Sequence, residues 1–315
     1  MSDRSIYDRA KAQIEARRNN ARAEADYRSE IIRDKSPEVA EIDAELSKTG
    51  MLIFKTACDG GDITPIKERN RALQERRREI IVSLGYPEDY TDLKYTCPEC
   101  SDSGFVDGVR MCRCLKELII KGRIEASAMG RLIETQSFDN FDLSCYSYDK
   151  KVSERMSAIL AMAKSYVKNF GKKKENLLLI GPTGTGKTHI STAIARELIH
   201  AGYDVIYDST QNILADFEAD RFKNNYGREE NKADKYLECT LLIMDDLGTE
   251  FGNQFTVSAL YNLLNARQNK GLATVISTNL SPEELARKYE DRIYSRIFGG
   301  SKILPFEGKD RRVVK

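Results

Sequence analysis

The residues best suited to chemistry stand in the stretch GPTGTGKTH, which begins at Gly181 and ends at His189. Its spacing, G-x-x-x-x-G-K-[ST], is typical of a loop that binds phosphates, because glycines let successive backbone N–H groups point at one polyphosphate. Lys187 can reach the β- and γ-phosphates, and the Thr188 hydroxyl can ligate Mg²⁺. We therefore predict that the whole run binds ATP: Gly181, Pro182, Thr183, Gly184, Thr185, Gly186, Lys187, Thr188 and His189.

The residues on either side of this stretch support the prediction. Four apolar residues, 177–180, precede the loop, and Ile190, Ile194 and Leu198 follow it at helical spacing. A strand, a loop and a helix in this order direct the positive end of the helix dipole at the bound anion. A glycine-rich turn with a chance lysine is the alternative, and this context argues against it.

Polar side chains also end two other apolar runs. LLIMDD, residues 241–246, ends in Asp245 and Asp246, and TVIST is followed by Asn279. Ligands of open α/β sheets bind at the carboxyl ends of the strands. We expect Asp245 to hold Mg²⁺ and Asp246 to orient and polarise an attacking water. Asn279 is expected to hydrogen-bond the γ-phosphate or that water, with a plain turn asparagine as the alternative.

Four of the seven cysteines are close in sequence, as a C-x-x-C pair and a C-x-C pair: Cys97, Cys100, Cys112 and Cys114. Four thiolates on two short turns can complete a tetrahedral Zn²⁺ site, so we predict structural zinc here. The C-x-C pair is tighter than the usual spacing. Reduced cysteines buried in a core are the alternative.

Composition limits the remaining possibilities. The 50 Lys and Arg residues against 49 Asp and Glu leave a net charge of +1, so charge alone predicts no nucleic-acid partner. The charged N-terminus is unlike a signal peptide, and no apolar run approaches the roughly 20 residues that span a bilayer. We therefore expect a cytoplasmic protein with no membrane partner and with its thiols reduced.

The elements that must position these residues follow from periodicity. From residue 151, helical patterns alternate with five apolar strands, which predicts an α/β domain with a parallel sheet. The strands are expected at 177–180, 205–209, 241–246, 274–278 and 302–306. Residues 1–95 predict two or three amphipathic helices, with start signals at Ser36-Pro37 and Thr64-Pro65. This region is either a small bundle with solvated charges or a module whose apolar stripe meets a partner.

The expected domain organisation therefore has four parts. Residues 1–95 form a helical partner-docking region, and residues 96–130 form the zinc-binding module and a following helix. Residues 131–150 are a linker whose Phe138, Phe141 and Tyr146 are suggested to lie near the nucleotide, and residues 151–315 form the ATPase domain.

The motifs GPTGTGKT, LLIMDDLGTE, VISTNLS and DRIYSRIFGG resemble the AAA+ ATPases of the bacterial replicative helicase-loader family, the DnaC/DnaI type. The related transposition-helper ATPases of the IstB type share them. The resemblance covers about residues 135–315, and the cysteine module and N-terminal helices look like the zinc-containing, helicase-binding domain of the DnaI-like branch. It implies a AAA+ domain, and the short stretch after the last predicted strand implies one with no C-terminal helical lid.

The resemblance also implies a homo-oligomer in which an arginine reaches the ATP of a neighbouring subunit. Arg296 matches the position of this arginine finger best, Arg292 is the nearby alternative, and both are otherwise surface arginines on a helix. Arg312 matches a second phosphate-sensing arginine, although Arg311 stands where an apolar residue is usual.

Single-stranded DNA is the other ligand that the resemblance implies. Its candidate surface is residues 211–236, where aromatic and cationic residues suit base stacking and phosphate contacts: Phe217, Arg221, Phe222, Lys223 and Tyr226. An amphipathic helix and loop is the alternative. The leading hypothesis is an ATP-hydrolysing loader that binds a replicative DNA helicase through its N-terminal region and delivers it onto single-stranded DNA. A transposition helper acting on duplex DNA and a nucleotide-gated adaptor with little hydrolysis are the other hypotheses.

Overall fold

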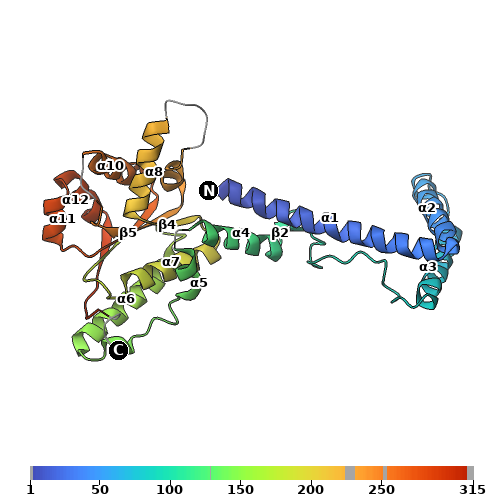
Figure 1. Cartoon of the computed structure of the whole chain (residues 1–315), viewed down its shortest axis with the longest axis horizontal. Helices are drawn as coiled ribbons and strands as arrows, with labels where there is room; N and C mark the ends of the chain where they lie inside the picture. The colour runs from blue at the N-terminus through green and yellow to red at the C-terminus, as the bar shows by residue number, and fades with distance from the viewer. Residues whose placement is uncertain (1–2, 128, 224–230, 251–253, 311–315) are drawn as a thin grey trace. The chain divides into compact units, whose positions relative to one another are not determined.

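The computed structural model describes residues 3–127, 129–223, 231–250 and 254–310. The chain divides into two compact units, residues 11–115 and residues 1–10 with 116–315. Its elements in chain order (Figure 1) are α1 (Asp3–Lys35), α2 (Pro37–Cys58), α3 (Thr64–Ser83), β1 (Phe105–Val106), β2 (Arg110–Met111), α4 (Arg113–Ala126), α5 (Gly130–Thr135), a 3₁₀ turn (Ser144–Tyr146), α6 (Lys150–Asn169), β3 (Asn176–Ile180), α7 (Lys187–His200), β4 (Val205–Ser209), α8 (Thr210–Lys223), α9 (Asp234–Glu238), β5 (Leu241–Leu247), α10 (Gln254–Asn269), β6 (Ala273–Thr278), α11 (Pro282–Lys288), α12 (Asp291–Phe298) and β7 (Ser301–Pro305).

The second unit contains a five-stranded parallel sheet, which confirms the predicted α/β class. The strand order is β4-β5-β6-β3-β7, so β3 lies between β6 and β7. The strand that follows β3 in sequence, β4, lies at the opposite edge of the sheet and pairs with β5. Leu177 of β3, for example, is in register with Val275 on one side and Lys302 on the other. Because all strands run the same way, the carboxyl ends of β3, β5 and β6 lie at one edge of the sheet, where ligands of such sheets bind.

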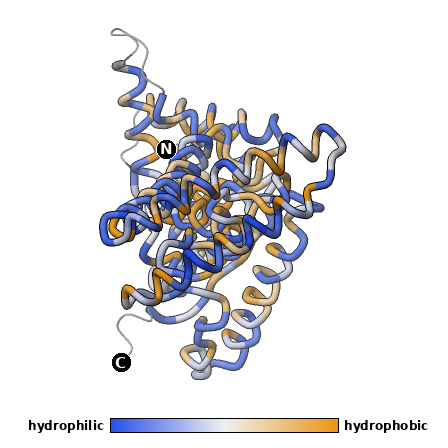
Figure 2. Tube along the Cα trace, turned by 90° about the vertical axis from the view of Figure 1, so that its right-hand side faces the viewer, coloured by the Kyte–Doolittle hydropathy of each residue, from blue (hydrophilic) through white to orange (hydrophobic). Residues whose placement is uncertain are grey.

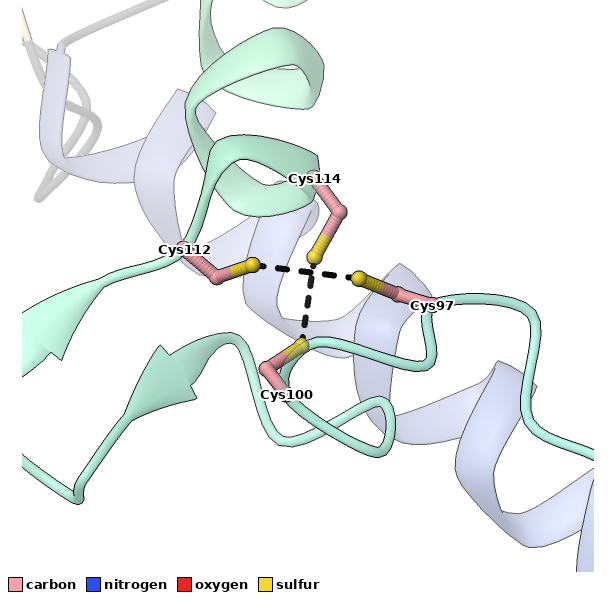
Figure 3. Close-up of side chains that lie close together, drawn as sticks. All are labelled: Cys97, Cys100, Cys112 and Cys114. Atoms are coloured by element: carbon pink, nitrogen blue, oxygen red, sulfur yellow. Dashed lines mark hydrogen bonds between the residues drawn. The ribbon is translucent and has the colours of Figure 1, made fainter.

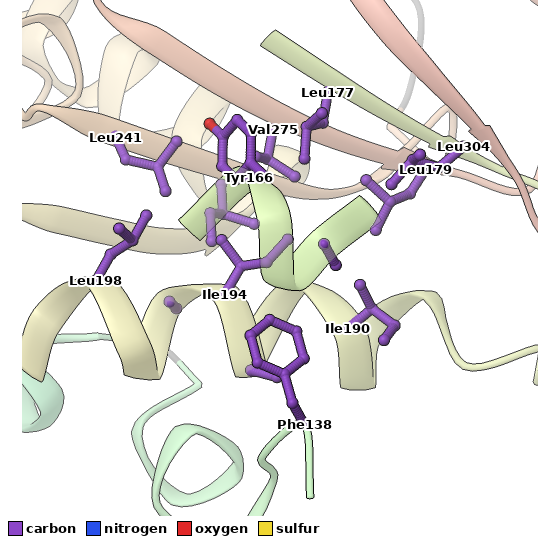
Figure 4. Packing of buried hydrophobic residues seen from close by; sticks show 14 of the residues in the cluster. Phe138, Tyr166, Leu177, Leu179, Ile190, Ile194, Leu198, Leu241, Val275 and Leu304 are labelled. Atoms are coloured by element: carbon purple, nitrogen blue, oxygen red, sulfur yellow. The ribbon is translucent and has the colours of Figure 1, made fainter. Parts of the chain in front are cut away.

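Helices cover both faces of this sheet, and alternate residues of each strand pack against them. Leu177 and Leu179 face α6 and α7, where Ile190 and Ile194 form the predicted apolar side of α7 (Figure 4). Leu178 and Ile180 belong to a second core, which they share with residues of α8, α10, α11 and α12. A parallel strand buried on both faces explains the continuous apolar runs of the sequence.

The unit of residues 11–115 contains the helices α2 and α3, which begin at the two predicted start signals and pack against one another. Their core combines Ile32, Val39, Ile42, Ile80 and Ile81. Along the helical trace, hydrophobic residues recur between hydrophilic ones (Figure 2), as amphipathic helices require. Among the described residues, no helix combines the length and the apolar character that crossing a membrane demands.

Candidate functional site

The predicted phosphate loop connects the end of β3 to the first residue of α7. Gly181, Gly184 and Gly186 have φ angles of 150°, 71° and 95°, which residues with a side chain rarely adopt. Space is also short, since a Cβ atom on Gly181 would lie 2.1 Å from the Phe306 carbonyl oxygen. The loop therefore depends on its glycines, and the helix that it opens offers the positive end of its dipole to an anion.

Lys187 and Thr188 begin α7. The Lys187 side chain is buried, and its Nζ donates to the carbonyl oxygens of Gly181 at 2.6 Å and Pro182 at 2.7 Å. The Thr188 hydroxyl donates to Oδ2 of Asp245 at 3.4 Å. The loop thus curls around the lysine ammonium, and the threonine hydroxyl lies beside the carboxylate with which it was predicted to share a magnesium ion.

Asp245 is almost fully buried near the end of β5, with both carboxylate oxygens engaged. Its Oδ1 accepts a hydrogen bond from Ser277 on β6, and its Oδ2 accepts one from the Tyr207 hydroxyl on β4 at 2.8 Å. Burial, followed by the charge of Asp245, raises the pKa of Tyr207, so the phenol stays protonated and donates. Two hydroxyl groups that no sequence motif indicated, those of Tyr207 and Ser277, therefore orient the predicted metal ligand.

Asp246 has the opposite environment, because the strand bulges at this point. The pairing of β5 with β6 slips between Met244 and Leu247, and Asp246 has a φ of 53° with an exposed side chain. Its backbone N–H donates to the Ser277 hydroxyl at 3.1 Å. A bulge re-aims one side chain of a strand, and here it places two successive carboxylates in different surroundings.

One cleft of about 590 Å³ brings these groups together. Its lining residues are Met129, Leu132, Gln136, Cys145, Thr183, Gly184, Gly186, Lys187, Thr188, His189, Asp245 and Asp246. One wall consists of residues predicted from the sequence, and the other comes from the segment 129–145, which was interpreted mainly as a linker. Asn279 lines a neighbouring pocket of about 440 Å³ together with Gly181 and Pro182.

The segment 136–146 is fastened to the phosphate loop and α7. The Tyr146 hydroxyl donates to the Thr185 carbonyl at 2.9 Å. The rings of Phe141 and His189 pack edge to face, with their centroids 5.1 Å apart. Nε2 of His189 lies 2.9 Å from the Ser137 carbonyl and 3.0 Å from Oδ1 of Asn140. His189 therefore lines the cleft but also anchors this segment.

The two arginines predicted as finger candidates, Arg292 and Arg296, are not among the residues that line this cleft. On α12, Arg296 donates to Gln268 at 3.0 Å and to the Tyr261 hydroxyl at 3.2 Å, both on α10 of its own chain. Arg292 is exposed on the same helix. The role of either one as an arginine finger stays a prediction, and Arg312 lies outside the described residues.

The structure describes only part of the proposed DNA-binding surface, residues 211–236. Phe217 on α8 stacks on Tyr236 with ring centroids 6.4 Å apart, and the Arg221 guanidinium lies 5.3 Å from the centre of the Phe255 ring. The side chains of Phe222, Lys223 and Tyr226 lie outside the described residues. Binding of single-stranded DNA at this surface stays a prediction.

The four clustered cysteines converge in the unit of residues 11–115 (Figure 3). Their Sγ atoms all lie within 4.8 Å of one another, with Cys97 and Cys112 at 3.8 Å and Cys100 and Cys114 at 3.4 Å. A tetrahedral zinc site, with Zn–S bonds of about 2.3 Å, separates its sulfurs by about 3.8 Å. The buried Asp102 accepts the backbone N–H groups of Thr96 and Cys97 and so fixes the first turn.

The thiols of this cluster influence one another's ionisation. Burial raises the pKa of Cys100, but hydrogen bonds with the Gly104 backbone and the other thiols outweigh it and lower that pKa to about 7. Burial and the proximity of Cys100 raise the pKa of Cys114. Like charges at this distance oppose each other, so four thiolates need a cation among them. The cluster can bind zinc, and the donor set and spacing fit that metal.

Comparison with known proteins identifies the family. The family described as IstB-like ATP binding protein matches residues 121–312, more than half of the chain. The chain belongs to this family. The predicted resemblance is thereby confirmed, and with it the assignment as a P-loop ATP-binding protein.

The individual relatives share about a quarter of their residues with this chain over the matched region. The replicative helicase loader DnaC of Escherichia coli (strain K12) is 24% identical over 177 residues, or 56% of this chain and 69% of DnaC. The phage-like element PBSX protein XkdC of Bacillus subtilis (strain 168) is 25% identical over 72% of this chain and 86% of XkdC. The insertion sequence IS21 putative ATP-binding protein of Pseudomonas aeruginosa is 23% identical over 58% of this chain and 66% of its own.

The chain is also similar to solved structures. The crystal structure of the DnaC helicase loader has a TM-score of 0.47 at 20% identity, covering 56% of this chain and 98% of that one. A crystal structure of a DNA replication initiation factor has a TM-score of 0.46 at 24% identity, over 55% of this chain. The chain spans half the length of that initiation factor.

Proposed function

We propose that this protein hydrolyses ATP and uses it to deliver a replicative DNA helicase onto single-stranded DNA. The observation that carries the ATPase part is the single cleft that unites Lys187 and Thr188 with Asp245 and Asp246. The helicase part is supported by the relative DnaC, which is named a replicative helicase loader. It is further supported by the helices and cysteine cluster that precede the ATP-binding domain.

In the proposed mechanism these groups divide the work of binding the phosphates and activating the water. Lys187 binds the β- and γ-phosphates in place of the loop carbonyls that it now contacts. Thr188 and Asp245 would hold Mg²⁺, which would supply charge neutralisation on the phosphates. Asp246 orients the attacking water and accepts its proton, and Asn279 or an arginine of a neighbouring subunit stabilises the γ-phosphate.

Hydrolysis is tested by Asp246→Asn, which keeps the shape of the side chain and removes its charge. We expect turnover to fall at least about 100-fold while ATP affinity changes less than about threefold, because general-base catalysis is worth about that much and the phosphate contacts remain. Steady-state phosphate release and ATP titration measure the two quantities. If wild type and variant release phosphate at equal, near-zero rates, hydrolysis is not the function, and a nucleotide-gated adaptor is supported instead.

The surface proposed to meet the helicase lies on α2. Met51, Leu52 and Phe54 are exposed to 71%, 49% and 74%, which is unusual for large apolar side chains that follow one another so closely on a helix. The core of this unit uses other residues of the same helix, including Val39 and Ile42. Exposed apolar side chains on a helix suit binding in a hydrophobic groove of a partner protein.

Phe54→Glu tests this surface in the full-length protein. We expect its affinity for a purified bacterial replicative helicase to fall at least about tenfold, because a charge would enter an apolar interface. Ala72→Glu, which adds the same charge at an exposed position of α3, is the matched control and should bind like wild type. Binding by biolayer interferometry, with ATP present, measures both. Equal affinity of wild type and Phe54→Glu would rule out this surface.

A second candidate function is that of a transposition helper acting on duplex DNA. It is favoured by the family itself, which is named for IstB, and by the relative from insertion sequence IS21. The same binding experiment separates the two functions. No binding of wild type to the helicase, together with tighter ATP-dependent binding to duplex than to single-stranded DNA, would favour the transposition helper.

A further inference from the structure

The loop that follows the two aspartates is fastened to α11 by three side chains, Glu250, Lys288 and Tyr289, which we call the clasp. Glu250 is buried, with 7% of its surface exposed. Its Oε2 accepts the backbone N–H of Gly248 at 2.8 Å, and its Oε1 accepts the Tyr289 hydroxyl. Nζ of Lys288 lies 3.4 Å from the same Oε1. The carboxylate thus joins its own loop to the end of α11.

Lys288 and Tyr289, the partners of Glu250, are also held by hydrogen bonds. Lys288 also donates to the carbonyl oxygens of Gly248 and, at 3.0 Å, of Glu250. Burial, followed by the hydrogen bond and charge of Glu250, raises the pKa of Tyr289, so the phenol remains a donor. Hydrogen bonds to a charged group are stronger than neutral ones, and a buried charge that loses a partner is costly.

One side of the clasp leads to the catalytic strand. Gly248 is two residues from Asp246, and the Leu247 carbonyl between them accepts the Thr278 hydroxyl at 2.7 Å. A Cβ atom on Gly248 would lie 2.4 Å from the Leu280 side chain, next to Asn279. The loop is therefore packed directly against the turn that carries Asn279.

The other side leads to the predicted finger arginines. α11 begins at the capping box of Ser281 and Glu284, directly after the turn that carries Asn279, and ends at Lys288. α12, with Arg292 and Arg296, starts at Asp291 and packs against α11 (Figure 1). A single buried carboxylate is thus connected, through Gly248 and Lys288, to the strand that carries Asp246, the turn that carries Asn279 and the helix pair that carries the arginines.

We infer that Glu250 is a positioning residue for ATP hydrolysis, holding Asp246 and Asn279 in a set relation to the arginine-bearing helix α12. It touches neither nucleotide nor water in this role, which rests on the proposed ATPase function. Catalytic groups act efficiently when a supporting shell of hydrogen bonds fixes them, and a small misplacement costs rate more than binding.

Glu250→Gln is the first test, since glutamine keeps the size but turns an NH₂ group toward one of the donors. We expect kcat to fall about tenfold while the ATP dissociation constant stays within about twofold, because phosphate binding uses other residues. Glu283→Gln, on the exposed surface of α11, is the matched control and should match wild type. Tyr289→Phe should lower kcat too, and combining it with Glu250→Gln should add little, because both act through one clasp.

Hydrogen exchange at the Gly248 amide provides a measurement that needs no turnover. This N–H donates to Glu250, so we expect it to exchange about tenfold faster in Glu250→Gln and unchanged in Glu283→Gln. Unchanged exchange overturns the clasp, and faster exchange with unchanged kcat overturns its positioning role. Should ATP affinity and melting temperature fall together with kcat, Glu250 serves folding alone and the inference is wrong. If wild type and Asp246→Asn turn over equally, the proposed hydrolysis fails, and exchange still decides whether the clasp exists.

Discussion

Lys187→Ala is expected to abolish ATP binding, raising the dissociation constant by about 100-fold or more, because a charge-assisted contact to two phosphates disappears. The Lys187 ammonium is also the group around which the loop carbonyls of Gly181 and Pro182 turn. The variant therefore loses both a phosphate ligand and part of the loop's fixed shape. Titration with a fluorescent ATP analogue measures the effect.

Lys172→Ala is a suitable control, since Lys172 is exposed shortly before β3 and lies away from the loop. It should bind ATP like wild type. Melting temperatures of both variants separate lost contacts from lost folding. Retention of wild-type affinity by Lys187→Ala, in a folded protein, would mean that the cleft does not bind the phosphates as proposed.

Cys100→Ser is expected to release zinc and to unfold the segment that contains the cluster, because metal binding and folding are coupled in small sites of this kind. The segment from Cys97 to Cys114 has two strands of only two residues each, so little else holds it together. We expect zinc content to fall from about one ion per chain to nearly none, by the tetrahedral stoichiometry of such sites. Elemental analysis and limited proteolysis measure metal content and local folding.

Cys58→Ser is the control, as Cys58 is exposed at the end of α2 and stands apart from the cluster. It should keep its zinc and its resistance to protease. The assignment fails if freshly purified wild type contains no zinc and Cys100→Ser leaves the proteolysis pattern intact. Helicase binding by the same variants would show whether the metal supports the docking surface on α2.

Most of the sheet and one wall of the cleft could be predicted because their signals are local. Apolar runs predicted the strands. The glycine spacing and the two aspartates that end an apolar run predicted the phosphate loop, Asp245 and Asp246, which line one cleft. The roles of Tyr207 and Ser277 could not be predicted, because a hydroxyl within an apolar run has no assignable partner until the neighbouring strands are known. The pairing of β4, β5 and β6 supplies those neighbours, and pairing is a long-range property.

The second wall and the clasp illustrate the same limit. Residues 129–145 have weak periodicity and suggested mainly a linker, yet Leu132 and Gln136 line the same cleft as the phosphate loop. Glu250 ends the motif LLIMDDLGTE, but nothing in that motif indicates its partners Lys288 and Tyr289, which are nearly forty residues away. Where a side chain's role depends on a partner distant in sequence, spacing within a motif cannot reveal it.

The left-handed backbone at Asp246 restricts which residues can replace it. Glycine, asparagine and aspartate occupy that region at little cost, whereas longer or branched residues are strained there. Of these three, aspartate alone carries a charge. The bulge in β5 therefore favours a short side chain at position 246 and limits how far a carboxylate there can extend. Glutamate, which is one methylene longer, would cost roughly 1–2 kcal/mol in this left-handed backbone region.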